Sequence, residues 1–232
     1  MKTILLLSIF LFTSNCEKKP EKIFFGIPEE ERATILLGLL NSNNLEYTSY
    51  GTVRDPKTRL EWKRCSQGQV FRQTEQDCQG TTSQSGITTS PQTGITTGNL
   101  DISAFGAIKL TYCSKPSNDC NTSALPPALI LNTVNNSISG AYISCASESL
   151  GSATNWRVPS TPELLGVASL GRIALLKVFP NQQENYYWSS WSNEQDLTGR
   201  TARAVSFYID TYGKESLWTK DSYFYVRCVR NY

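Results

Sequence analysis

The pattern of hydrophobic and polar positions separates a short apolar start from the rest of the chain. Residues 4–12 are apolar except for Ser8, and Lys2 precedes them. The run is shorter than the ~20 residues that a membrane-spanning helix needs, and its charged start is typical of a signal peptide. We therefore expect a signal peptide over residues 1–15, followed by a charged, proline-containing tether over residues 16–27.

An amphipathic stretch then predicts a helix, which we place within residues 28–46. Pro28 is tolerated at a first helical position, and the three acidic residues after it favour the positive end of the helix dipole. Residues 33–40 are strongly apolar, and the asparagine-rich residues 41–44 favour an end to the helix. Such a helix can pack on its own domain or pair between two copies of the chain.

The remaining residues, 47–232, predict a single domain that is long enough to bury a sizeable core. Residues 47–64 predict strands around a turn at Asp55-Pro56, with Leu60 and Trp62 on one face. One helix is expected over 136–150, capped by Ser137 or Ser139. A second is expected from Ser160, with an extension to Leu176, because a hydroxyl cap is followed by proline and Glu163. Further strands are predicted over 107–113, 186–191, 202–209, 216–218 and 223–229.

Residues 79–99 interrupt this pattern. They are poor in large apolar side chains and contain an imperfect repeat, SGITT at 85–89 and TGITT at 93–97. Two short copies are too few for a solenoid. We interpret the segment as an insertion in the domain, either a long hairpin or a loop.

The seven cysteines divide into one and six. Cys16 follows the apolar run at the position where bacterial lipoproteins accept a diacylglycerol, although Thr13 and Asn15 match only the relaxed signals of spirochaete lipoproteins. A plain cleaved signal peptide is the alternative. Six cysteines in an exported chain then predict three disulfides. Fifteen pairings are formally possible; short loops favour Cys65–Cys78 and Cys113–Cys120, which leaves Cys145–Cys228.

Composition excludes several kinds of chemistry. The chain contains no histidine and no CxxC pair, so we expect no zinc site and no cofactor. The formal charge is +2; loss of Lys2 with the signal peptide leaves 21 basic and 20 acidic residues, or +1, which argues against a nucleic-acid partner. Glu194, Asp196 and Asp210 can contribute to a cation site, but scattered carboxylates are usually solvated.

Six short segments occur in the order of a known family: TRLEW at 58–62, AYISC at 141–145, NWRVPSTPEL at 155–164, YWSS at 187–190, AVSF at 204–207 and YVRCVR at 225–230. From about residue 51 to 230 the chain resembles the C-terminal domain family of the Legionella collagen-like adhesin. The resemblance implies an α+β, C-type-lectin-like or sulfatase-modifying-factor-like fold, with two helices and a twisted antiparallel sheet. It also implies a disulfide between the first helix and the last strand, which supports Cys145–Cys228. The collagen-like stalk is absent, and Cys113 and Cys120 need not follow the family.

Aromatic and arginine residues fall into two groups. We interpret one group as structural because tryptophan, proline and arginine in these contexts usually close a core: Trp62, Trp156, Arg157, Pro159, Trp188 and Arg227. For Arg227 and Arg230, either a buried ion pair or a ligand contact is open; we expect Arg227 and Val229 on one face of the last strand. The second group lies in or beside the loops between the last strands, and we interpret it as candidate ligand-binding residues: Trp191, Trp218, Tyr208, Tyr212 and Tyr223.

These observations predict an outer-membrane lipoprotein, periplasmic or surface-exposed, that is held to the membrane by a lipid on Cys16. We expect an adhesin-like binding module for a glycan, matrix or envelope-protein ligand, and not an enzyme. One alternative is a carbohydrate-active enzyme that uses Glu163, Glu184 or Glu194, which would need two carboxylates about 5–10 Å apart. Another is a structural envelope protein without a ligand. The calcium-binding motifs of C-type lectins are absent.

Overall fold

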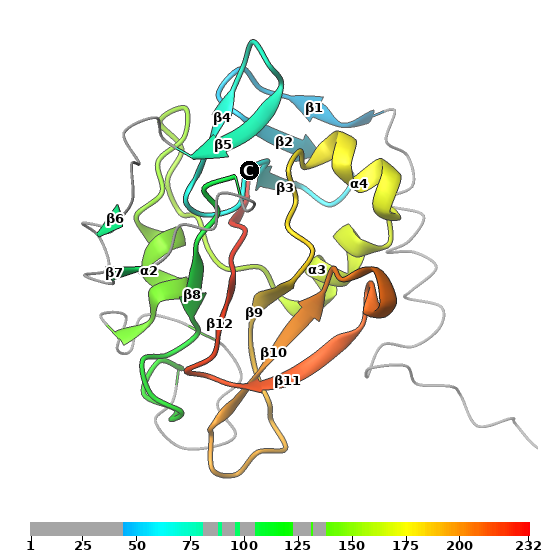
Figure 1. Ribbon diagram of the computed structural model, residues 1–232. Helices are drawn as coiled ribbons and strands as arrows, with labels where there is room; N and C mark the ends of the chain where they lie inside the picture. Colours follow the sequence, from blue (N-terminus) through cyan, green and yellow to red (C-terminus); the bar gives the residue numbers. More distant parts are fainter. Residues whose placement is uncertain (1–43, 81–87, 90–95, 98–104, 123–130, 132–137) are drawn as a thin grey trace, which may run out of the picture. The chain divides into compact units, whose positions relative to one another are not determined.

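Figure 1 shows the computed structural model, which describes residues 44–80, 88–89, 96–97, 105–122, 131 and 138–232. All of them belong to the second of two compact units, Ile35–Tyr232. The predicted signal peptide, Cys16, the tether and residues 28–43 lie outside the described residues. The predicted end of the N-terminal helix at residue 46 is wrong. Glu46 belongs to β1 (Glu46–Tyr47), where it pairs with Arg54.

A four-stranded antiparallel sheet has the order β1-β2-β3-β13. It joins β1 to β2 (Thr52–Asp55), β3 (Leu60–Lys63) and β13 (Val229–Asn231). The turn between β2 and β3 is where the sequence predicts it. The Asp55 carboxylate accepts hydrogen bonds from Lys57 N (2.9 Å) and Thr58 Oγ1 (2.8 Å) and so fixes this turn. Leu60 and Trp62 are both buried.

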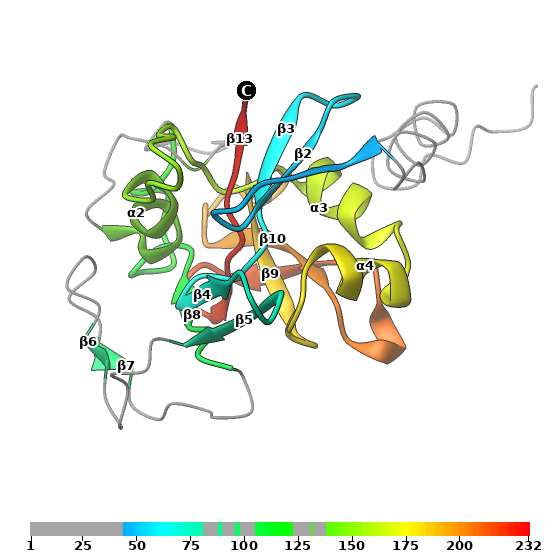
Figure 2. The ribbon, with the colours of Figure 1, turned by 90° about the horizontal axis from the view of Figure 1, so that it is seen from above.

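A five-stranded mixed sheet has the order β11-β10-β9-β12-β8. It contains β8 (Lys109–Thr111), β9 (Tyr186–Ser192), β10 (Thr201–Ser206), β11 (Glu215–Thr219) and β12 (Tyr223–Tyr225). β12 and β9 run parallel, and the other neighbours run antiparallel. Figure 1 shows β9, β10 and β11 side by side, and Figure 2 shows β9 beside β10.

The prediction of one strand over 223–229, with Arg227 and Val229 on one of its faces, is wrong. The segment forms β12 in the five-stranded sheet and β13 in the four-stranded sheet, and residues 226–228 pass between them. There Gln67 N donates to Val226 O (2.9 Å) and Lys63 N donates to Cys228 O (3.0 Å). These tertiary bonds replace a continuous ladder, and they leave Val226, Arg227, Cys228 and Val229 all buried.

Three α-helices lie in the described part of the chain: α2 (Gly140–Ala146), α3 (Thr161–Ala168) and α4 (Arg172–Val178). Ser139 caps α2, which is shorter than predicted because the chain turns after Ala146. α3 begins with the predicted capping box between Ser160 and Glu163. The predicted extension to Leu176 is interrupted, because Gly171 adopts φ 76° and begins a separate helix.

Two hairpins complete the described elements. β4 (Gln69–Arg72) pairs with β5 (Asp77–Gly80). Within the insertion, β6 (Thr88–Thr89) pairs antiparallel with β7 (Thr96–Thr97), so the two threonine pairs of the sequence repeat lie opposite each other. This supports the hairpin interpretation of the segment. Its first two residues, Gln79 and Gly80, belong to β5, and its remaining residues lie outside the described part.

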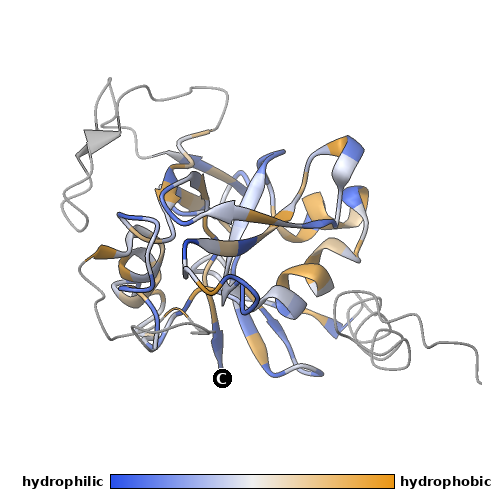
Figure 3. Cartoon of the chain, turned by 90° about the horizontal axis from the view of Figure 1, so that it is seen from below, coloured by the Kyte–Doolittle hydropathy of each residue, from blue (hydrophilic) through white to orange (hydrophobic). Residues whose placement is uncertain are grey.

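The five-stranded sheet separates two hydrophobic clusters, and Figure 3 shows how apolar and polar positions alternate along the elements that enclose them. One cluster packs α3 and α4 against Tyr187 and Val205. The other surrounds Trp188 and contains two of the three disulfides. All three predicted disulfides form, with Cα–Cα distances of 5.4 Å for Cys65–Cys78, 5.8 Å for Cys113–Cys120 and 5.4 Å for Cys145–Cys228. The described chain is therefore an α+β domain stapled by disulfides.

Candidate ligand-binding face

Strand alternation places two tryptophans on one face of the five-stranded sheet. Trp188 of β9 lies opposite Ala204, and Trp218 of β11 lies opposite Ala202, two residues along β10. The other face carries Tyr187 and Val205, which pack on α3. The sheet thus presents one face to the helix α3 and the opposite face to the region around the two tryptophans.

The part of this face around Trp188 is closed. Trp188 is fully buried, and its indole Nε1 donates to Leu110 O at 2.9 Å. Its ring meets Tyr112 edge-on, with centroids 5.6 Å apart. Trp188 therefore serves the core, as the sequence predicts.

The part around Trp218 is open, and four aromatic rings gather there. We call Tyr186, Tyr208, Trp218 and Phe224 the aromatic platform. The Tyr186 ring centroid lies 5.6 Å from Tyr208, 5.1 Å from Trp218 and 5.1 Å from Phe224. Tyr208 and Trp218 are 39% and 38% exposed, whereas Tyr186 and Phe224 are half-buried beneath them. Edge-to-face packing of this kind stabilises the positions of the exposed rings without covering them.

The platform also carries polar atoms without partners. Within the described part of the chain, the hydroxyls of Tyr186 and Tyr208 and the indole Nε1 of Trp218 have no hydrogen-bond partner. By contrast, the indole Nε1 groups of Trp156 and Trp188 each donate to a backbone carbonyl. The platform can therefore offer both ring faces and hydrogen-bonding groups to a ligand.

The structure brings together only two of the five predicted ligand-binding residues, Tyr208 and Trp218. Tyr212 packs into the α3 core at 5.6 Å from Phe207, and burial raises the pKa of its hydroxyl to about 12. Tyr223 is 55% exposed and Trp191 is 36% exposed, but no described ring contact joins either residue to the platform.

Sequence reasoning missed the other two members, Tyr186 and Phe224. Each belongs to an aromatic run of a strand, Tyr186 to YYW at 186–188 and Phe224 to YFY at 223–225. The signal that can find them is alternation. Each is adjacent in sequence to a buried core tyrosine, Tyr187 or Tyr225, and therefore points to the opposite face of the sheet.

The three carboxylates considered for catalysis are each held by an arginine. Glu163 accepts bidentate hydrogen bonds from Arg157 (2.7 and 2.8 Å) and one from Ser160 N (2.7 Å). Burial raises the pKa of Glu163, but the Arg157 bonds outweigh it and the net pKa is lowered. Glu184 pairs with Arg172, and Glu194 pairs with Arg203. Each of the three carboxylates therefore has an arginine partner in the structure.

The carboxylates considered for a cation are also engaged or isolated. The Asp196 carboxylate accepts hydrogen bonds from Thr198, Arg200 and Thr201, which close the β9–β10 loop. Although burial opposes it, these bonds hold the pKa of Asp196 far below its usual range. Asp210 is exposed. Among the described residues, no group of three or more His, Cys, Asp or Glu side chains can hold a metal ion.

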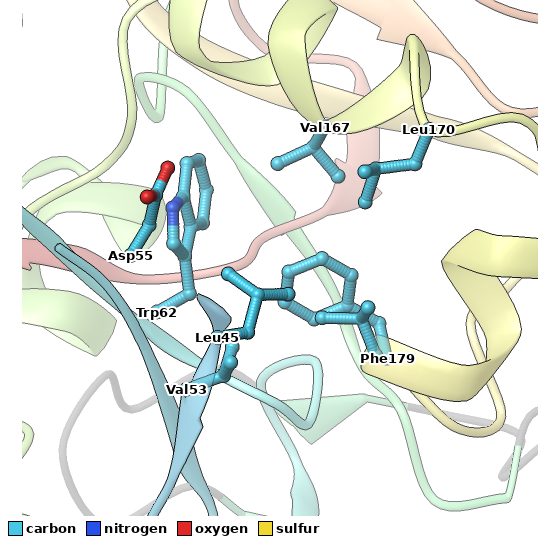
Figure 4. A pocket seen from close by; sticks show the side chains of 8 residues that line it. Leu45, Val53, Asp55, Trp62, Val167, Leu170 and Phe179 are labelled. Carbon is cyan, nitrogen blue, oxygen red and sulfur yellow. The ribbon is translucent and has the colours of Figure 1, made fainter. Parts of the chain in front are cut away.

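Figure 4 shows a small apolar pocket between the four-stranded sheet and the helices α3 and α4. Its lining consists of Leu45, Val53, Asp55, Trp62, Val167, Leu170, Val178 and Phe179. Asp55 is the one acidic residue in this set, and its carboxylate already fixes the β2–β3 turn. The pocket therefore offers no free reactive group.

Three of the residues that we interpret as structural from the sequence are buried or bonded within the domain: Trp156, Arg157 and Arg227. Trp156 is buried, and Arg157 binds Glu163 as described. Arg230 pairs with the fully buried Glu61. Of the two roles considered for Arg230, the structure therefore shows the ion pair and not the ligand contact. Arg227 is also buried, but it donates to the carbonyls of Lys63 and Arg64 and to the side chains of Ser66 and Gln182. Its guanidinium lies 4.3 Å from the Phe179 ring centroid.

Fold and site together define a disulfide-bonded α+β domain with an exposed aromatic face on one sheet. Residues 51–230 match the family model of the Lcl C-terminal domain, and the chain belongs to this family. This confirms the resemblance read from the six sequence segments, and it is consistent with an exported surface protein. No curated protein and no solved structure matches the chain. In the described part of the chain, no helix has the length and apolarity to cross a membrane.

Proposed function

We propose that the protein is an adhesin-like binding module, anchored to the outer membrane by a lipid on Cys16, with a glycan, matrix or envelope-protein ligand. The aromatic platform carries this proposal. Two partly exposed rings, fixed by two half-buried rings, form a surface that is already ordered before a ligand arrives. Exposed aromatic groups of this kind are enriched at binding sites.

The architecture supports a C-type-lectin-like assignment of the fold. The helix α2 is joined by Cys145–Cys228 to the segment that leads into the last strand, β13. This is the disulfide that the fold family implies. In such a fold the loops and strands near the end of the domain bind ligands, and the platform draws its residues from β9, β11, β12 and the segment after β10.

An array of glycans and extracellular-matrix proteins tests the binding function. We expect the chain from residue 17 onward to bind at least one array component, and Trp218→Ala to weaken that binding about tenfold or more because a ring of the platform is lost. Trp191→Ala is the matched control, since Trp191 is 36% exposed and Trp218 is 38% exposed. Absence of binding to every component, or equal losses in the two variants, would contradict the proposal.

Metabolic labelling tests the anchor. We expect the full-length chain to incorporate labelled palmitate and to partition into detergent. A lipidated cysteine carries a diacylglycerol and an added acyl chain, and several acyl chains together give stable membrane attachment. Cys16→Ser is expected to lose both properties. An unlabelled chain that remains in the aqueous phase would contradict lipidation of Cys16.

A further inference from the structure

We propose that the edge strand β11 (Glu215–Thr219) pairs antiparallel with β11 of a second copy of this chain. The proposal is independent of the binding function proposed above. Three observations carry it: the strand is an unprotected sheet edge, its outward backbone groups have no partners, and its side chains suit a pairing of the strand with itself.

Strand β11 is the longest of the edge strands that the structure describes in the two larger sheets. It has five residues, whereas the other edges, β1, β8 and β13, have two or three. Figure 1 shows β11 along the edge of the five-stranded sheet. Native proteins usually protect such an edge with lysine, proline or a bulge. The strand contains neither residue, and its register with β10 is unbroken from Glu215 to Thr219.

The one charge in β11 does not block an approaching strand. Glu215 pairs with Arg203 of β10, and the Glu215 side chain is only 5% exposed. Its charge is therefore turned toward its own sheet. The exposed side chains of the strand are uncharged: Leu217 is 49% exposed, Trp218 is 38% exposed and Thr219 is exposed. A second strand can cover them without removing a charge from water.

Backbone hydrogen bonds at the two ends of β11 fix which of its groups point outward. Ser206 N donates to Lys214 O, and Lys220 N donates to Arg200 O, both at 2.9 Å. In an antiparallel ladder, bonded and non-bonded pairs alternate. The even-numbered residues of β11 therefore bond to β10, and the odd-numbered residues direct their N–H and C=O groups away from it.

The outward groups belong to Glu215, Leu217 and Thr219. Among the described residues, the N–H groups of all three and the carbonyls of Glu215 and Leu217 have no partner outside the ladder. The Thr219 carbonyl is engaged, because Ser222 N donates to it at 2.9 Å. Such a row of unpaired groups is a template for another strand.

A two-fold axis at Leu217 uses these groups most fully. It places Leu217 opposite Leu217 of the second copy, and Glu215 opposite Thr219. Four N–H···O bonds can then form, two between the Leu217 residues and one from each Thr219 N–H to Glu215 O of the other copy. No like charges face each other within the five pairs, and the two exposed Leu217 side chains meet.

The residues that flank β11 also permit this pairing. Lys214 would lie opposite Lys220 of the second copy, but the Lys220 amine is held inside its own domain by Asn118 and Asn121. Lys220 is fully buried, so the two ammonium groups are kept apart. The pairing would join two five-stranded sheets into one, and the two-fold axis would place both aromatic platforms on the same face of it.

Sedimentation equilibrium tests the pairing. We expect the chain from residue 17 onward to be monomeric at about 10 µM and increasingly dimeric toward about 1 mM, because one edge strand buries far less than the ~800 Å² per partner of a stable interface. Leu217→Pro should weaken the dimer about tenfold or more, because the lost N–H points away from β10 and the ladder within the domain is kept. Leu217→Ala is the matched control; it retains the N–H and should weaken the dimer about threefold at most.

Cysteine cross-linking tests the register, and it does so even if the proline variant fails to fold. In a hydrogen-bonded pair the two Cα atoms lie about 5.5 Å apart, which suits a disulfide. Leu217→Cys should therefore form a covalent dimer on mild oxidation at about 200 µM. Thr219→Cys is the control, because the two Thr219 residues would lie about 13 Å apart across the axis.

Three results would overturn the proposal. One is a chain that remains monomeric at every concentration. Another is a dimer that Leu217→Pro leaves unchanged, which would place the contact elsewhere, as in the helix predicted within residues 28–46. The third is equal cross-linking of Leu217→Cys and Thr219→Cys, which would indicate random collision. None of these results bears on the binding function, which the ligand array tests separately.

Discussion

Trp188 and Trp218 lie on the same face of one sheet, yet their surroundings differ completely. Trp188 is fully buried and its indole N–H is bonded, whereas Trp218 is 38% exposed and its indole N–H has no partner among the described residues. Phe224 touches both rings, at 4.9 Å from Trp188 and 5.2 Å from Trp218. The two regions differ in what packs over them. Residues of β8 and of the disulfide-bonded loop after it bury Trp188, and Trp218 does not belong to that cluster.

The largest expected effect tests whether the closed region carries stability and the open region does not. Trp188→Ala should lower the free energy of unfolding by about 4 kcal/mol, because it leaves a large cavity and an unpaired carbonyl. Trp218→Ala should lower it by less than about 1 kcal/mol. Urea unfolding followed by circular dichroism measures both values. Similar losses in the two variants would show that the platform is part of the core.

A smaller effect is expected at Lys220, which joins the two regions. This lysine directly follows β11, and its Nζ reaches the closed region, where it donates to Asn118 Oδ1 (2.6 Å) and Asn121 Oδ1 (2.7 Å). It also lies 5.5 Å from the Tyr112 ring centroid. Burial lowers the pKa of Lys220 to about 8. Because an unfolded lysine titrates near 10.4, the unfolded state binds more protons between these two pKa values, and stability should rise with pH in that window.

Substitution of this lysine isolates that pH dependence. Between pH 7 and pH 9.5 the wild-type free energy of unfolding should rise by about 2 kcal/mol relative to Lys220→Met, which has no group to titrate there. Lys214→Met is the control, because Lys214 flanks β11 at its other end and is exposed. Urea unfolding over this pH range provides the measurement. If the free energies of unfolding of the wild type and Lys220→Met change with pH in parallel, the pKa of Lys220 is not lowered in the folded state.

Local signals in the sequence predict local structure well. The cap of α3 depends on residues three apart, Ser160 and Glu163, and the structure confirms it. The break at Gly171 and the division of 223–229 between two sheets depend on the backbone conformation and on distant hydrogen-bond partners, which the pattern of side chains does not encode.

The same limit applies to the candidate site. Tyr208 and Trp218 stand out beside loops, and alternation indicates that Tyr186 and Phe224 face away from the core tyrosines next to them. Only the tertiary contacts show that both rings pack against Trp218 and that Tyr212 packs against Phe207 in the core. The pairing of the three disulfides could be predicted from the sequence because two of them close short loops, with sequence separations of 13 and 7. The two remaining cysteines then form the third pair.

Buried Arg227 has a consequence for how the domain assembles. Its donors are satisfied by residues 63–66 and Gln182, which precede it by 45 positions or more, and no carboxylate among the described residues pairs with it. A partly assembled chain that desolvated this cation before all of these acceptors were in place would leave strong donors unsatisfied, which is costly. The arginine therefore penalises half-formed intermediates. Correct placement of the segment between β12 and β13 therefore depends on both of these earlier segments.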